Sequence, residues 1–167
     1  MAWYKKLRAK LQALAKLSWR DVLLLSEAWL TLAWVDLLIQ VLPYHLWRGW
    51  LQTDAETSEE PVGLAASGTE AAKLSQIERI IRLTETAARH HLRPMNCLRR
   101  TLVQRKLLQR RGVEGEVQIG VRKAGAALEA HAWLCWQGRV LNDAEDVGER
   151  YARLDVYQWE GVGRFVD

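Results

Sequence analysis

The sequence predicts an α+β fold, with helices first and an antiparallel sheet after them. Apolar residues recur every three to four positions up to about residue 111, and every second position from residue 117 onwards. Pro43, Pro94 and Gly112 stand at the junctions between these periodic segments. With 167 residues and a hydrophobic fraction of 49%, the chain can build one domain around a core. A run of helices followed by a run of strands is typical of the α+β class.

The first predicted helix is short, basic and amphipathic. Its apolar residues recur at helical spacing between lysines and an arginine: Tyr4, Leu7, Leu11 and Leu14. Such a helix can dock on a partner, pack on its own domain or lie on an anionic membrane. We favour the first two over peripheral membrane contact.

A second helix is predicted over residues 19–42. Ser18, followed three residues later by Asp21, resembles a capping box, and Pro43 ends the helix. The segment is apolar on nearly all sides, so we expect it to be sandwiched between other elements.

The second helix is long enough to cross a bilayer, but Glu27 and Asp36 interrupt its apolar run. Each would cost about 2.5–3.5 kcal/mol near the middle of a membrane, so we expect a packed helix instead. Charges also interrupt the N-terminal segment, and no cleavage site of a secretory signal follows. The two cysteines, Cys97 and Cys135, therefore indicate free thiols in a cytoplasmic protein rather than a disulfide.

Residues 53–68 are acidic and polar and contain one proline and two glycines, which is typical of a flexible linker. This linker separates an N-terminal helical region, residues 1–52, from a domain over residues 69–167. The domain begins with a third helix over 69–91, which ends before Pro94 because the residue preceding a proline avoids helical geometry.

A fourth helix is predicted over 97–111, with Gly112 as its C-terminal cap. Strands follow over 117–121, 128–136 and 139–143, and a short further strand around 156–159. The second and third strands form a hairpin whose turn contains Gln137 and Gly138.

Cys97 falls where the fourth helix begins. The positive end of a helix dipole favours a thiolate, and Arg99 and Arg100 would add to the positive potential there. A thiolate is the nucleophile that cysteine hydrolases use. By position alone, a small buried apolar residue is the more common interpretation of Cys97, because most lone cysteines are of this kind.

His131 and Asp143 are the candidate partners of the thiol. An imidazole can take the thiol proton and later protonate a leaving amine, and a carboxylate can orient that imidazole. Viewed singly, His131 could be a structural strand residue and Asp143 a turn residue. Hairpin register favours their pairing if the loop has three residues, 136–138, because Cys135 then lies opposite Arg139 and His131 opposite Asp143.

Other chemistry is excluded or disfavoured. Cys135 lies on the same strand face as His131 and is expected in the core. His90 and His91 lack the usual spacing of zinc ligands, so no metal site is predicted. The basic face of helix 97–111 is typical of a solvated surface, although it could attract an acidic peptide. Basic and aromatic residues do not interleave, which excludes nucleic acid, and no phosphate-binding glycine loop indicates a cofactor.

Five ordered segments resemble one known family: Asn-Cys-Leu-Arg-Arg-Thr-Leu (96–102), Leu-Leu-Gln-Arg-Arg-Gly-Val (107–113), Val-Gln-Ile-Gly-Val-Arg-Lys (117–123), Ala-His-Ala-Trp-Leu (130–134) and Gly-Arg-Val-Leu-Asn-Asp (138–143). They are similar to the transglutaminase-like C-terminal domain of lasso-peptide leader peptidases, the B-type processing proteins related to the microcin-processing protease. The resemblance covers residues 69–143 closely, and the apolar segment 18–50 is similar to the N-terminal part of the stand-alone form.

The resemblance implies a papain- and transglutaminase-like core in which the helix bearing the cysteine packs on the sheet. It implies a protease triad of Cys97, His131 and Asp143 that removes the leader from a ribosomally made precursor peptide. The expected partners are that precursor, a small separate leader-recognition protein and the cyclase that forms the macrolactam. The Cys97 backbone N–H is expected to contribute to the oxyanion hole.

Two other functions stay open. The chain could be a catalytically idle transglutaminase-like scaffold whose tryptophan-rich helices dock on a partner enzyme or a membrane surface. The same triad could also transfer an amide instead of hydrolysing it. Reactivity of the thiol separates an enzyme from a scaffold, and product mass separates hydrolysis from transfer.

Overall fold

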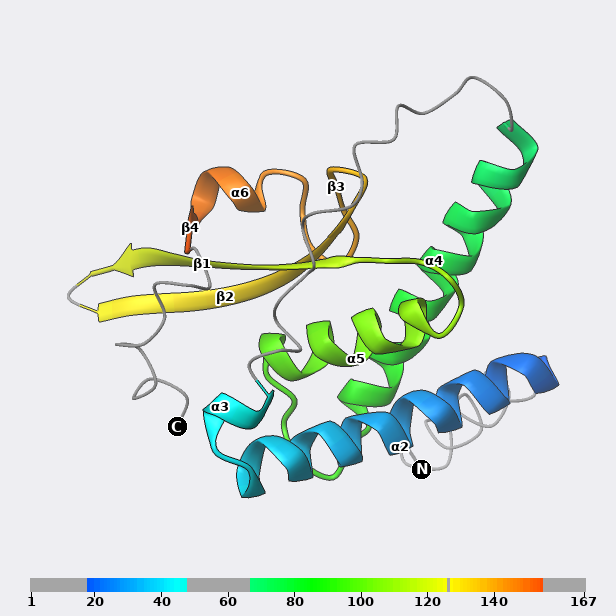
Figure 1. Cartoon of the computed structure of the whole chain (residues 1–167), viewed down its shortest axis with the longest axis horizontal. Coiled ribbons are helices and arrows are strands. Elements are labelled where there is room, and N and C mark those ends of the chain that lie inside the picture. The colour runs from blue at the N-terminus through cyan, green and yellow to red at the C-terminus, as the bar shows by residue number, and fades with distance from the viewer. Residues whose placement is uncertain (1–17, 48–66, 126, 155–167) are drawn as a thin grey trace, which may run out of the picture.

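The computed structural model describes residues 18–47, 67–125 and 127–154 (Figure 1). The predicted basic helix of residues 1–16, most of the predicted linker and the predicted strand around 156–159 lie outside these residues. The described elements are α2 (Trp19–Val41), α3 (Tyr44–Trp47), α4 (Ser67–Arg89), α5 (Cys97–Gln109), β1 (Glu116–Ala124), β2 (Ala127–Trp136), β3 (Arg139–Val140), α6 (Val147–Arg150) and β4 (Ala152–Arg153).

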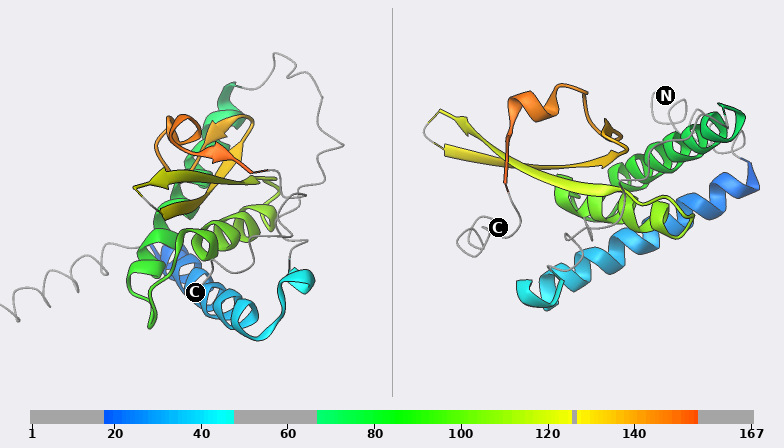
Figure 2. Two further views of the ribbon diagram at one scale, coloured as in Figure 1. Left: turned by 90° about the vertical axis from the view of Figure 1, so that its left-hand side faces the viewer. Right: turned by 45° about the horizontal axis from the view of Figure 1, so that its top comes forward.

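The elements form layers around α5. One face of a four-stranded antiparallel sheet, in the order β3-β2-β1-β4, packs on α5, and α2 and α4 contact α5 from its other sides (Figures 1 and 2). The short helix α6 lies over the opposite face of the sheet. This arrangement confirms the predicted α+β class. The helices come first in the chain, and the helix that begins at Cys97 packs on the antiparallel sheet.

The ends of the helices follow the local sequence signals. Ser18 and Asp21 form a complete capping box at the start of α2, and Leu42, before Pro43, is already extended. Asn96 caps α5, because its Oδ1 accepts a hydrogen bond of 3.0 Å from the Arg99 backbone N–H. Gly112 ends the turn after α5 with a positive φ of 71°, which costs glycine little.

One long helix, α2, is held to the rest of the chain by both apolar and charged contacts. Four of its apolar side chains are buried in the main core: Leu24, Ala28, Leu32 and Val35. Its acidic residues all meet arginines of later elements: Asp21 meets Arg79 at 2.6 Å, Glu27 meets Arg111 at 2.6 Å and Arg110 at 2.9 Å, and Asp36 meets Arg99 at 2.8 Å. By length and composition α2 could cross a membrane, but its acids are paired within the domain.

The hairpin between β2 and β3 differs from the prediction. The turn has two residues, so Trp136 pairs with Arg139 and Cys135 pairs with Val140. The predicted three-residue loop is therefore wrong. Gln137 and Gly138 both have positive φ, 49° and 75°, as in the turn type whose twist matches that of antiparallel strands.

The third strand is also shorter than the predicted 139–143. Leu141 N–H still donates to the Leu134 carbonyl at 2.8 Å, but the Leu134 N–H donates to the side chain of Asn142 rather than to a backbone carbonyl. The ladder therefore stops at Leu141, because the Asn142 side chain replaces the next main-chain acceptor. Residues 141–143 form a bend, and strand alternation does not govern where Asp143 points.

Candidate active site

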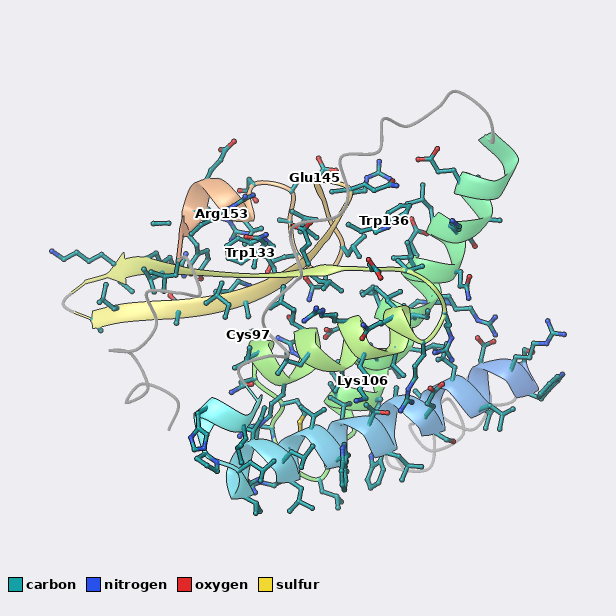
Figure 3. All side chains as sticks on the ribbon, in the orientation of Figure 1. Cys97, Lys106, Trp133, Trp136, Glu145 and Arg153 are labelled. Atoms are coloured by element: carbon teal, nitrogen blue, oxygen red, sulfur yellow. The ribbon has the colours of Figure 1, made fainter. Side chains whose placement is uncertain are left out.

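The two faces of β2 carry different side chains. Ala132 and Leu134 belong to the core that the sheet shares with the helices. Because side chains alternate along a strand, His131, Trp133 and Cys135 point to the other face, where Trp133 and Cys135 pack with Val147 and Tyr151. Figure 3 shows Trp133 on the α6 side of the sheet.

His131 and Asp143 are in direct contact on this second face. His131 Nε2 lies 2.6 Å from Asp143 Oδ2, and the two side chains are 21% and 24% exposed. The bend at 141–143 brings the carboxylate there, although a two-residue turn would place Ala144 opposite His131 in a continued strand. The predicted contact is present, but the hairpin register predicted for it is not.

The Asp143 carboxylate is held from several sides. Its Oδ1 accepts the Ala144 backbone N–H at 2.7 Å and one guanidinium N–H of Arg150 at 3.1 Å. Partial burial by itself would raise the pKa of Asp143, but hydrogen bonds from His131, Ala144 and Arg150 outweigh it and leave the pKa below its ordinary value. The group is thus a stable anion at neutral pH and an acceptor for the imidazole.

Aromatic side chains surround the imidazole of His131. The ring of Tyr151 lies 5.1 Å away between centroids, and the ring of Trp133 lies 6.2 Å away. Gly120 pairs with His131 across the ladder, and a Cβ at this position would come within 2.9 Å of both Trp133 and Tyr151. Glycine at position 120 therefore leaves the space in which these rings pack beside His131.

Cys97 lies at the first position of α5, half-buried against the helical core with Met95 and Leu98. Figure 3 shows Cys97 on the α5 side of the sheet. His131 instead has ring contacts with Trp133 and Tyr151, which pack together on the other face. Among the described residues, no hydrogen bond joins Cys97 to His131. The structure thus brings two of the three predicted residues together, and the complete triad stays a prediction.

The arginines beside Cys97 are engaged with acids. Arg99 Nε lies 2.8 Å from Asp36 Oδ1, and Arg100 donates to Glu85 Oε2 at 2.7 Å. Their charges are thus largely offset, contrary to the expectation that both would add positive potential at the thiol. The helix terminus itself is the remaining local source of positive potential.

A buried hydrogen-bond network lies between α4, α5 and β2, and its central residue is Asn142. Asn142 Oδ1 accepts from Leu134 N–H at 2.8 Å, and Nδ2 donates to Thr101 Oγ1 at 3.0 Å and Gln104 Oε1 at 2.7 Å. Gln104 in turn donates to Glu85 at 2.8 Å. Thr101 and Gln104 are fully buried.

This network fixes the residue next to Asp143. Thr101, one turn after Cys97, also donates to the Ala132 carbonyl at 3.2 Å, next to His131 in the chain. The helix of Cys97 and the chain segments of His131 and Asp143 are therefore joined through the same buried groups. Asn142 and Thr101 position the site without touching the reacting atoms.

The Asn142→Asp variant should lose stability, by about 1–3 kcal/mol, because a carboxylate keeps the bond from Leu134 N–H but faces Gln104 Oε1 without a proton to donate. Gln104 cannot simply turn its amide, because its Nε2 already donates to Glu85. Urea unfolding measures the change. A matched Asp146→Asn control should stay within about 0.5 kcal/mol of the parent. Equal stabilities of the two variants would show that the Asn142 donor is not needed.

The sequence analysis did not identify Asn142, Thr101, Gln104 or Arg150. Asn142 and Thr101 stand inside the quoted segments, but an asparagine before a turn and a threonine in a helix are common surface residues. Their role depends on contacts between residues 31 and 41 positions apart, which no local pattern reveals.

Cys135 and His91 are accounted for by packing. Cys135 is buried, as predicted, and burial raises the pKa of its thiol. His91 packs against Trp29, with ring centroids 4.9 Å apart. No group of potential metal ligands is present in the described part of the chain.

Thiol labelling should therefore distinguish the two cysteines. In the folded protein near neutral pH, iodoacetamide is expected to modify Cys97 at least about tenfold faster than Cys135, which is buried and protonated. Peptide mass mapping after timed quenching gives both rates, and labelling in urea should make them equal. Equal rates in the folded protein would contradict this assignment.

Comparison with known proteins gives one match. Residues 38–156 match the family model of the Transglutaminase-like superfamily, a stretch that includes Cys97, His131 and Asp143. No curated protein and no solved structure shows a significant match to the chain.

Proposed function

Because the chain belongs to the transglutaminase-like superfamily, we propose that it is a cysteine protease that removes the leader from a lasso-peptide precursor. The observation that carries the proposal is the 2.6 Å contact between His131 and Asp143. A histidine held by a carboxylate is the base that a cysteine at a helix N-terminus needs. The ordered similarity over residues 96–143 supports the leader-peptidase assignment.

In the proposed mechanism the two imidazole nitrogens have separate roles. Asp143 engages Nε2, so Nδ1 is left to accept the thiol proton of Cys97. The sulfur then attacks the carbonyl of the last leader residue, and the imidazolium protonates the departing amine of the core peptide. Water, deprotonated by the imidazole, hydrolyses the thioester and releases the leader as a carboxylic acid.

The reaction requires the thiol within hydrogen-bond reach of Nδ1. Cys97 and His131 lie on different sides of the sheet, so the proposal requires a rearrangement on substrate binding that brings the thiol to the imidazole. The backbone N–H of Cys97, in the first turn of α5, has no acceptor within the helix and would stabilise the oxyanion.

We further propose that the protein acts in the cytoplasm with a separate leader-recognition protein, and that its product passes to a macrolactam-forming cyclase. Hydrolysis frees the amine of the core peptide that such a cyclase would acylate. No metal or cofactor enters the proposed steps.

The test uses a precursor peptide and a leader-binding protein taken from the neighbouring reading frames, which the proposal expects to encode both. The chain is incubated with them and the products are identified by mass spectrometry. Two fragments whose masses sum to the precursor plus one water would establish hydrolysis. With a primary amine added, a leader fragment carrying that amine would establish amide transfer instead. An intact precursor under all these conditions would contradict both reactions.

A catalytically idle scaffold is the second candidate, because Cys97 packs against the helical core whereas His131 contacts Trp133 and Tyr151 on the other face of the sheet. Such a protein would bind the precursor or the cyclase without cleaving it. Pull-down of the cyclase by a chain that shows no cleavage would favour this function.

A further inference from the structure

The outer face of α2 carries a stripe of exposed apolar side chains, interrupted by the exposed Ser26. Its large side chains are more than half exposed: Trp19 (68%), Leu23 (59%), Leu30 (64%), Trp34 (54%), Leu37 (54%) and Val41 (68%). Their spacing of three, four or seven residues places them on one side of the helix, opposite the buried Leu24, Ala28, Leu32 and Val35. Over 23 residues the stripe is about 34 Å long.

None of the stripe side chains is charged, so none of them would repel an apolar or anionic surface. The acidic residues of α2 all meet arginines of the domain: Asp21, Glu27 and Asp36. Arg20 is exposed beside the stripe, with its guanidinium 5.5 Å from the Trp19 ring centre. The stripe therefore carries no charged side chain, and it is flanked by the exposed Arg20 and by the partly exposed Glu27, which is paired with arginines.

The sequence immediately before α2 adds further positive charge. Residues 1–17 contain no acid, and their basic residues are Lys5, Lys6, Arg8, Lys10 and Lys16. An apolar helix face next to a polybasic segment is the combination of two signals that anchors proteins stably to anionic bilayers. A second copy of this chain would bring the same positive charges together, so a dimer is the weaker fit.

We propose that the outer face of α2 docks on the surface of an anionic phospholipid bilayer, with the helix lying parallel to the membrane. Trp19 and Trp34, at two points along the stripe, would sit at the level of the headgroups, where indole rings are favoured. The helix lies on the bilayer rather than crossing it, because crossing would separate three acids from their arginines. For the basic segment that precedes α2, the sequence alone favours docking on a partner or on the chain itself; the exposed apolar face of α2 favours lipid for the helix that follows it.

Vesicle flotation of the full chain tests the proposal. The protein should float with vesicles of equal parts phosphatidylcholine and phosphatidylglycerol, and much less with phosphatidylcholine alone. In the triple variant W19Q/L30Q/W34Q, the fraction of protein that floats with the vesicles should fall at least about tenfold. The reason is that three exposed apolar side chains that would insert into the bilayer are removed. The matched control L92Q/L128Q changes two exposed leucines elsewhere, 85% and 66% exposed, and should float like the parent.

A second variant, K5Q/K6Q/K10Q, tests the charge component independently of the helix. It should reduce binding to the anionic vesicles at low salt, and added salt should reduce binding of the parent in the same way. Failure of the parent to float with anionic vesicles would overturn the proposal. So would unchanged flotation of W19Q/L30Q/W34Q, or a parent dimer that this variant converts to a monomer, because the stripe would then join two copies. Precursor cleavage in vesicle-free solution should be unaffected by the triple variant, which keeps this test separate from that of the proposed protease.

Discussion

The Cys97→Ala variant is expected to leave the precursor uncleaved, with a rate reduced by on the order of 10⁴ or more, because the acyl-enzyme has no other nucleophile. The fold should persist, because Cys97 is only half-buried and the side chain that caps α5 is that of Asn96. Cleavage assays under single-turnover conditions, with circular dichroism of each variant, measure both properties.

Cys135→Ala is the matched control. It removes a sulfur from the other face of the sheet, where the side chain is 5% exposed, and should keep most of the activity at some cost in stability. If Cys135→Ala were inactive and Cys97→Ala active, the nucleophile would be misassigned. If both were active, the cleavage would not proceed through a thiol.

Asp143→Asn is expected to lower the cleavage rate by on the order of 10² to 10⁴ while preserving the fold, because an amide no longer orients the imidazole or stabilises its charged form. The amide can still accept from the Ala144 N–H, so the bend should survive. Since the pKa of Asp143 lies below its ordinary value, the carboxylate stays charged throughout the neutral and mildly acidic range, and a loss of parent activity there is expected to come from other groups.

Asp146→Asn tests the specificity of that effect. Asp146 also contacts Arg150, at 3.3 Å, but its side chain is 57% exposed and makes no capping hydrogen bond to α6. An exposed ion pair contributes about 0–1 kcal/mol, so this variant should be nearly neutral. A damaging Asp146→Asn combined with a silent Asp143→Asn would show that the wrong carboxylate has been assigned.

The helices were predictable because their signals are local. Ser18, Asp21, Pro43 and Gly112 act through hydrogen bonds or backbone restrictions within a few residues, and each marks a helix end where the structure has one. The short elements α3, α6 and β4 were not predicted, because elements of two to four residues carry no measurable periodicity.

The site was only partly predictable. The contact between His131 and Asp143 was anticipated, but for the wrong reason: the prediction assumed a regular strand up to residue 143. Asn142 ends that strand by replacing a main-chain acceptor with its side chain, and it can do so only because Thr101 and Gln104 hold its amide. The partners of Arg99 and Arg100 were equally hidden, since they lie on α2 and α4.

The ion pairs of α2 have a consequence during synthesis. The arginines that neutralise its acids follow much later in the chain, 58 residues after Asp21 and 83 to 84 residues after Glu27. At roughly 5–20 residues per second, α2 leaves the ribosome some 3 to 17 seconds before these partners leave it. During that interval both of its apolar faces are uncovered and its carboxylates are unpaired. The nascent chain therefore presents a hydrophobic segment, preceded by lysines, to chaperones and targeting factors. It does so before the later elements on which α2 packs have been synthesised.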